Sequence, residues 1–195
     1  MNKADVLSRF IPNSLHAIEM LSLAIHLKQK WGQPQPMKIF IAGELTIEGN
    51  SHAITNPAVE AGIIHCRALL EFLGLSMSKD GALQNLARPR KSDDFGIEHF
   101  LNATGRPLAC VSPAQAVLHH SGGTAEAEQA LLSVFRVANK GLAHLTSSFS
   151  MNPEETRLLK IASHVIPILI DNYLYKPHGL DAPLAQINSR PCETN

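Results

Sequence analysis

The sequence predicts an all-α fold, a bundle of about five helices that forms a single domain over residues 1–195. Proline, glycine and capping residues divide the 195-residue chain into segments of helical length. Aromatic residues make up 5% of the chain, which is few for a β-sandwich. Hydrophobic residues make up 45%, so the chain is apolar enough to form a core and too apolar for intrinsic disorder.

The N-terminal part of the chain is expected to contain one helix and the main strand-like stretch. Leucine and isoleucine recur over residues 14–31, and Gly32 with the prolines after it ends the predicted helix. Residues 37–48 (MKIFIAGELTIE) contain β-branched residues on both sides of Gly43, which allows a short β-hairpin.

Capping signals predict four further helices. Asn56, Ser112 and Asn152 each precede a proline, as an N-cap precedes proline at the first helical position, and Thr124 follows a Gly-Gly pair. The predicted helices cover residues 57–73, 113–120, 124–145 and 153–175, the last with a kink at Pro167. Residues 79–100 are irregular, and residues 176–195 are expected to form a loosely attached tail.

Charge and cysteine content narrow the class of protein. Lys plus Arg and Asp plus Glu number 17 each, and this neutral balance gives no support to nucleic-acid binding by bulk electrostatics. The three cysteines are far apart and form no CxxC pair, so a zinc ribbon or a secreted disulfide framework is not expected. The charged N-terminus does not look like a signal peptide, and no apolar stretch is long enough for a membrane span. We expect a soluble, cytoplasmic protein of bacterial type.

The helix predicted over residues 57–73 carries a single charged stripe. At about 100° per residue, Glu60, Arg67 and Glu71 fall on one side, and apolar residues cover nearly all the rest. Arg67 and Glu71 are four residues apart and can form an ion pair. One interpretation is a buried pair that bonds to the 124–145 helix and lines a site. The alternative is an ion pair on a solvated helix face.

The helix predicted over residues 124–145 carries a ridge of ionisable residues. Arg136, Lys140 and His144 succeed one another at intervals of four, and Asn139 lies beside Arg136. This pattern indicates either a solvated face or a cationic groove with a histidine that can move a proton near neutral pH. Thr146 follows closely enough to position His144, which can alternatively cap the carbonyls of its own helix.

Three segments together resemble the HEPN superfamily of helical proteins. They are HCRALLEFL at 65–73, SDDF at 92–95 and ANKGLAHLT at 138–146, and the resemblance covers roughly residues 57–175. It implies a helical bundle that often dimerises, in a group that includes metal-independent ribonucleases and RNA- or nucleotide-binding proteins. HEPN nucleases resemble one another in having four to six residues between an Arg and a His on one helix. Here seven residues separate Arg136 from His144, so the nuclease motif is degenerate.

These observations lead to one main hypothesis about function. Arg67, Glu71, Asn139, Lys140 and His144 would form one polar site that binds RNA or a nucleotide, with Asp93 and Asp94 contributed by a loop. Arg136 and Thr146 would belong to the binding residues. In a catalytic version, His144 would be the general acid/base for attack by a 2′-hydroxyl, and Arg67 or Lys140 would stabilise the developing charge.

Two alternatives come from other functional classes. The first is a non-catalytic, dimeric interaction domain with a protein or nucleotide partner, which the neutral charge balance favours. The second is a metal-dependent helical-bundle enzyme, which would need several of the ten histidines to converge. No HxxxH or HExxH spacing occurs, so neither a metal nor a cofactor is expected. A homodimer without membrane contact is expected.

Overall fold

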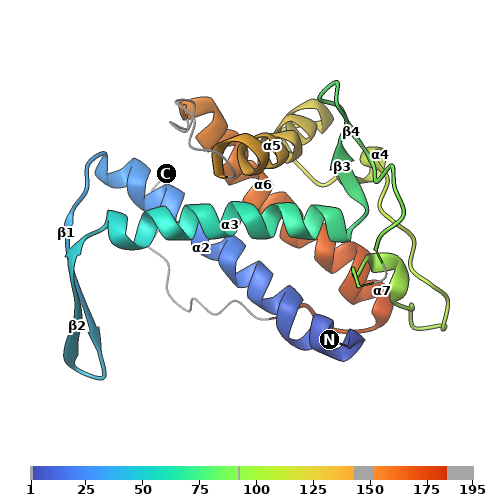
Figure 1. The fold of residues 1–195 in the computed structure, drawn as a ribbon, viewed down its shortest axis with the longest axis horizontal. Coiled ribbons are helices and arrows are strands. Elements are labelled where there is room, and N and C mark those ends of the chain that lie inside the picture. Colours follow the sequence, from blue (N-terminus) through green and yellow to red (C-terminus); the bar gives the residue numbers. More distant parts are fainter. Residues whose placement is uncertain (1, 92, 143–151, 184–195) are drawn as a thin grey trace.

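The computed structural model describes residues 2–91, 93–142 and 152–183 and is mostly helical. Four long helices make up the bundle: α2 (Ile11–Trp31), α3 (His52–Phe72), α5 (Thr124–Arg136) and α6 (Pro153–Ile170). α2 and α3 cross as an antiparallel pair, α6 packs against both, and α5 packs mainly on α6 (Figure 1). The predicted helical bundle is therefore confirmed. No helix within the described ranges is both long and apolar enough to cross a membrane.

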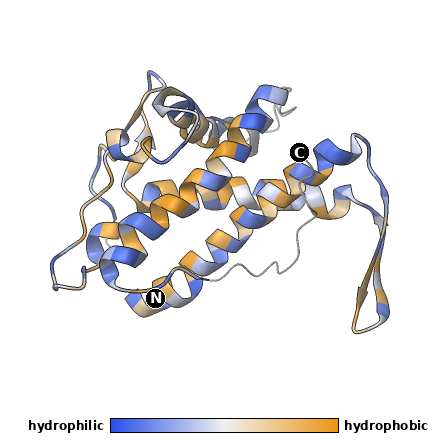
Figure 2. Ribbon diagram, turned by 180° about the vertical axis from the view of Figure 1, so that it is seen from behind, coloured by the Kyte–Doolittle hydropathy of each residue, from blue (hydrophilic) through white to orange (hydrophobic). Residues whose placement is uncertain are grey.

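The apolar side chains of the four helices meet in one core. Figure 2 shows hydrophobic residues along each long helix, interspersed with hydrophilic ones. On α3, the side chains of Ile63, Cys66 and Leu70 are 1% exposed or less. Burial of such faces supplies most of the stability of helices of this length.

The expected hairpin between α2 and α3 is present. β1 (Pro36–Ile41) pairs antiparallel with β2 (Glu44–Asn50), and the ribbon extends away from the helices (Figure 1). Ala42 and Gly43 connect the strands with φ angles of 51° and 88°. Positive φ at both central residues is the geometry of a two-residue type I′ turn, whose twist matches the twist of the strands.

α3 begins five residues earlier than predicted, so the expected N-cap at Asn56 is wrong. The Asn56 side chain instead accepts a hydrogen bond from Lys28 Nζ at 2.7 Å, between α3 and α2. Ser51 precedes the first helical residue and joins the helix to the hairpin base, because its Oγ accepts from the Gln35 N–H at 3.0 Å. Pro57 consequently lies inside α3.

The other predicted helices are confirmed with altered ends. The capping boxes of Ser112 with Gln115 and of Asn152 with Glu155 both form. α4 (Pro113–Ala116) is a single turn and does not reach residue 120, and α5 starts at Thr124 with Gly123 as its N-cap. Three π-helical stretches extend the helices: η1 (Val6–Phe10) before α2, η3 (Val137–Leu142) after α5 and η5 (Asp171–Tyr175) after α6.

Two parts of the chain that were expected to be irregular or loose have defined structure. A second hairpin pairs β3 (Leu75–Met77) with β4 (Leu83–Asn85), and η2 (Ile97–His99) is a short 3₁₀ helix. The start of the expected tail is attached: it forms α7 (Lys176–His178), and Pro177 accepts a backbone hydrogen bond from Ala103 at 2.8 Å. At the other end of the chain, α1 (Lys3–Asp5) is a short N-terminal turn.

The crossing of α2 and α3 depends on a glycine. A Cβ atom at Gly62 would lie 2.4 Å from Leu21 Cβ and 2.9 Å from the carbonyl oxygen of Ala17. Both distances are shorter than real contacts of this kind, so the two helices can approach this closely only because position 62 has no side chain.

We predict that Gly62→Ala destabilises the protein by about 1–3 kcal/mol, because the added methyl group pushes the helices apart. Alanine in an unhindered helix would instead be stabilising by about 1 kcal/mol, so the two effects have opposite signs. Urea denaturation gives the free energy of unfolding. Gly49→Ala is the control, because nothing lies within 4 Å of a Cβ at that position. A Gly62→Ala variant more stable than the parent would contradict the close crossing.

Candidate functional site

The Arg67–Glu71 pair forms as predicted, but it is not buried. Arg67 Nε donates to Glu71 Oε1 at 2.8 Å, and the two side chains are 38% and 40% exposed. Neither side chain bonds to a described residue of α5 or η3. The pair is therefore half-buried and not fully buried as expected, and the expected bond to the 124–145 helix does not form with any described residue of that helix. An ion pair this exposed contributes little to stability.

A largely buried cation, Arg90, lies next to this pair at the C-terminus of α3. The Arg90 side chain is 12% exposed, and its Nη2 donates to the carbonyl oxygens of Glu71 at 2.7 Å and Phe72 at 3.0 Å. Its Nε donates to Glu98 Oε1 at 2.8 Å. Arg90 therefore donates to the last carbonyls of the helix, of which that of Glu71 also accepts from the Gly74 N–H at 3.0 Å, and it places positive charge at the negative end of the helix dipole.

Glu98 and Cys110 complete this cluster around Arg90. Partial burial raises the pKa of Glu98, but the hydrogen bond from Arg90, a backbone N–H and the Arg90 charge together hold it below the ordinary value. Cys110 Sγ donates to Glu98 Oε2 at 3.4 Å, and partial burial followed by the Glu98 charge raises the pKa of this thiol. The thiol is therefore protonated at neutral pH and is a poor nucleophile. The bonds among Arg90, Glu98 and Cys110 thus stabilise the fold at the end of α3.

The remaining residues of the predicted site do not join Arg67 and Glu71. Asp93 and Asp94 are exposed, and Asp94 Oδ2 accepts from the backbone N–H of Lys91 at 3.3 Å within the same loop. Asn139 is exposed on η3, where the structure describes only the backbone of Lys140. His144 and Thr146 lie outside the described residues, so the predicted catalytic histidine has no position here.

Arg136 lines a groove of about 470 Å³ between α5 and the start of α6. Its other charged lining residues are Glu126, Glu154, Glu155 and Arg157. Arg157 is paired with both Glu126 and Glu154, and His120 Nε2 lies 2.6 Å from Glu126 Oε2. Over the described residues the groove thus holds three carboxylates and two guanidinium groups. The cationic groove predicted from Arg136, Lys140 and His144 stays a prediction, because the Lys140 side chain and His144 lie outside the described part of the chain.

The described histidines do not converge on a metal site. His65 Nδ1 bonds to Ser14 Oγ at 3.0 Å, while His119 contacts Tyr173 and His120 contacts Glu126. Burial lowers the pKa of His65, which favours its neutral form. Across residues 2–91, 93–142 and 152–183, no three His, Cys, Asp or Glu side chains are grouped as metal ligands.

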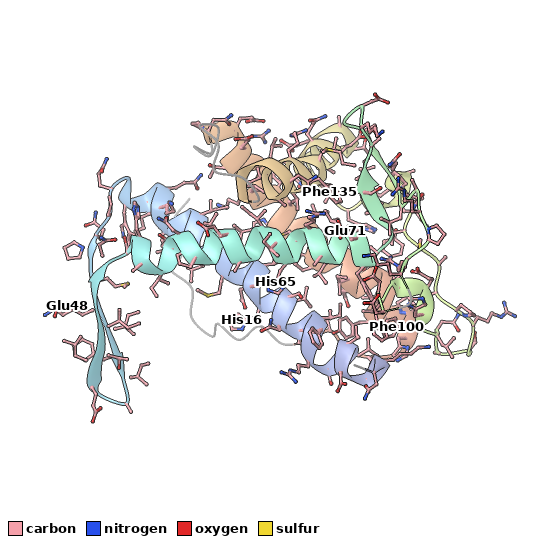
Figure 3. All side chains as sticks on the ribbon, viewed as in Figure 1. His16, Glu48, His65, Glu71, Phe100 and Phe135 are labelled. Carbon is pink, nitrogen blue, oxygen red and sulfur yellow. The ribbon has the colours of Figure 1, made fainter. Side chains whose placement is uncertain are left out.

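Among the described residues, four exposed large apolar side chains gather on the β1–β2 hairpin, a surface that sequence reasoning did not single out. Phe40 and Ile41 are each 60% exposed, Leu45 is 47% exposed and Ile47 is 39% exposed. Figure 3 shows Glu48 on this hairpin and Glu71 toward the opposite end of α3. The sequence signal that could have identified the surface is the stretch of large apolar residues on both sides of a two-residue turn.

The register of the hairpin decides which side chains share a face. Ile39 lies opposite Ile47, Lys38 opposite Glu48 and Phe40 opposite Leu45. Opposite residues of an antiparallel pair point to the same side. One face, the aliphatic face, carries Ile39, Ile41 and Ile47, with Glu44 opposite Ile41 at its turn end. The other carries Phe40 and Leu45 beside the Lys38–Glu48 ion pair, whose Nζ and Oε1 atoms are 3.0 Å apart.

Comparison with known proteins adds no family to this description. No protein-family model, curated protein or solved structure matches the chain. The resemblance to HEPN proteins stays a prediction, and the candidate sites rest on the geometry of the chain itself.

We predict that Arg90→Met destabilises the protein by about 2–4 kcal/mol, because it leaves the Glu98 carboxylate without its cation and removes the Arg90 hydrogen bonds from the helix end. Arg67→Met is the matched control. It removes a guanidinium from a similar 2.8 Å pair that is exposed, and it should cost at most about 1 kcal/mol. Urea denaturation of both variants at neutral pH measures the difference. Equal losses would show that burial of Arg90 has no energetic consequence.

The lowered pKa of Glu98 predicts a pH-dependent contribution to stability. A carboxyl whose pKa is lower in the folded state stabilises the fold above its unfolded pKa, and the contribution disappears as pH falls through the folded value. The parent protein should therefore exceed Glu98→Gln in unfolding free energy at about pH 7, and the difference should shrink below about pH 4. A difference that is constant over this range would contradict the assignment.

Proposed function

We propose that this chain is a non-catalytic interaction module that binds a protein partner through the β1–β2 hairpin. The observation that carries the proposal is the exposure of Phe40, Ile41, Leu45 and Ile47 on a ribbon that extends away from the bundle (Figure 1).

A hairpin that is exposed to water on both faces has little packing to stabilise it. A two-stranded ribbon is marginally stable by itself, and it gains stability from a third strand or from packing on another element. Its base is held by Gln35 and Ser51, and all seven residues of β2 are exposed. Exposed apolar patches on soluble proteins mark interaction surfaces. Binding a partner would supply the packing that this ribbon does not obtain from the described helices.

The charge of the hairpin favours a protein partner over a nucleic acid. Lys38 is the only basic residue of the two strands, whereas Glu44 and Glu48 are acidic. A ribbon that binds a nucleic-acid backbone needs several cations to neutralise phosphates. Two carboxylates near one ammonium group would instead repel a polyanion.

The geometry of the predicted RNA site gives the nuclease hypothesis less support. Arg67 is engaged by Glu71, and within the described residues no bond connects this pair with Asp93, Asp94, Arg136 or Asn139. Phosphoryl chemistry needs an acid/base group and a cation at one point, because proton transfer and charge stabilisation act on the same reacting atoms.

A photo-cross-linking amino acid at position 40 tests the proposal in the cells that produce the protein. We expect a discrete cross-linked protein species from position 40. We expect none from position 103, which is exposed on the connection between η2 and α4. The readout is the mass and composition of the cross-linked band.

Two results would contradict an interaction module without catalytic activity. One is the absence of any discrete species from position 40. The other is metal-independent RNA cleavage by the purified chain that His144→Gln abolishes without changing the melting temperature, which would favour the nuclease hypothesis.

A further inference from the structure

We infer that the hairpin's partner is a second copy of this chain, joined by antiparallel pairing of the two β1 edges about a two-fold axis at Ile39. This inference rests on the proposed function, because it names the partner of the same surface. Both strands of an isolated hairpin have a free edge, and a free edge is a row of unpaired N–H and C=O groups that can accept another strand.

The two edges are not equivalent, and the β2 edge is protected. The register passes from Ile39 opposite Ile47 to Phe40 opposite Leu45, so Thr46 is an extra residue in β2. Such a bulge bends the strand and interrupts pairing. β2 also carries Glu44 and Glu48 with no cation. Bulges and charges of one sign are devices by which edge strands avoid pairing.

The β1 edge lacks these features. Its single charge, Lys38, is already balanced by Glu48 across the hairpin. Pro36, which has no N–H to donate, is the first residue of the strand, and proline is tolerated in that position. The bulge and the acidic residues of β2 leave β1 as the edge that can accept another strand.

An antiparallel arrangement about Ile39 matches β1 to itself. Ile39 would lie opposite the partner's Ile39, and Met37 opposite the partner's Ile41, on the aliphatic face. On the other face Lys38 would lie opposite the partner's Phe40, where an ammonium group and an aromatic ring attract each other. No like charges face each other across this pairing, and like charges directly opposite are destabilising.

Two-fold pairing also closes the assembly. If β1 of one copy paired with β2 of the next, each copy would leave a new free edge and the chain of contacts would continue into a fibre. Pairing of β1 with β1 uses the favourable edge of both copies and leaves only the bulged, acidic edges outside.

The contact surface of two ribbons is smaller than the about 800 Å² per partner of a standard interface. The dimer is therefore expected to dissociate at micromolar concentrations.

Sedimentation velocity of the full chain over a range of micromolar concentrations tests this arrangement with three variants. Phe40→Lys places an ammonium group opposite the partner's Lys38 twice per dimer and should weaken association by about tenfold or more. Phe40→Glu removes the same ring but places a carboxylate opposite that lysine, so it should dimerise at least tenfold more tightly than Phe40→Lys. Leu45→Lys is the matched control: it changes an exposed residue of the same face on the outer strand, and it should change the dissociation constant by less than about threefold.

The results separate this inference from the proposed function. All variants alter exposed side chains, so their melting temperatures should equal that of the parent and establish that they are folded. If the chain is monomeric at every concentration and position 40 cross-links to a different protein, the inferred dimer is wrong but the proposed interaction module stands. If Phe40→Lys, Phe40→Glu and Leu45→Lys change the dissociation constant of the dimer equally, pairing through the β1 edge is wrong. If position 40 gives no cross-linked species either, the proposed function itself fails.

Discussion

The end of α3 is the constraint on which much of this structure depends. The last carbonyl groups of a helix have no partners within the helix, and here the end lies inside the fold, where water cannot supply them all. Arg90 takes the carbonyls of Glu71 and Phe72, the Val111 N–H donates to Leu73, and the Leu86 N–H donates to Gly74. The long connection from α3 to α5 contains few regular elements. Its course is set largely by these bonds, which attach it to the helix end at three separate points.

The sequence predicts local features of this fold well and long-range ones poorly. The capping boxes at Ser112 and Asn152 form because donor and acceptor are three residues apart, whatever the rest of the chain does. The same reasoning fails at Asn56, because the bond from Lys28 on a neighbouring helix engages its side chain. β3 and β4 have three residues each, too few to give a periodic pattern, and their pairing follows from where α3 ends.

In the candidate site, too, the sequence predicts the local contacts but not the long-range ones. The four-residue spacing of Arg67 and Glu71 is enough to predict their ion pair, but helical periodicity does not say which neighbours cover that side of the helix. The role of Arg90 could not be deduced from its basic surroundings in the sequence, since two of its three acceptors are backbone atoms 18 and 19 residues away. A strand pattern likewise does not reveal whether anything packs on the strands, so the apolar surface of the hairpin emerges only when the whole chain is folded.

The position of the hairpin between α2 and α3 has a consequence for how the protein reaches its native state. α2, β1, β2 and α3 are consecutive in the chain, and α2 packs more extensively on α3 than on any other element. Contacts between segments close in sequence need little loop closure and form early. During synthesis this unit leaves the ribosome before α5 and α6 exist, with the inner sides of both helices uncovered beside an apolar ribbon. The order of synthesis therefore creates an interval in which uncovered apolar surface favours misassociation.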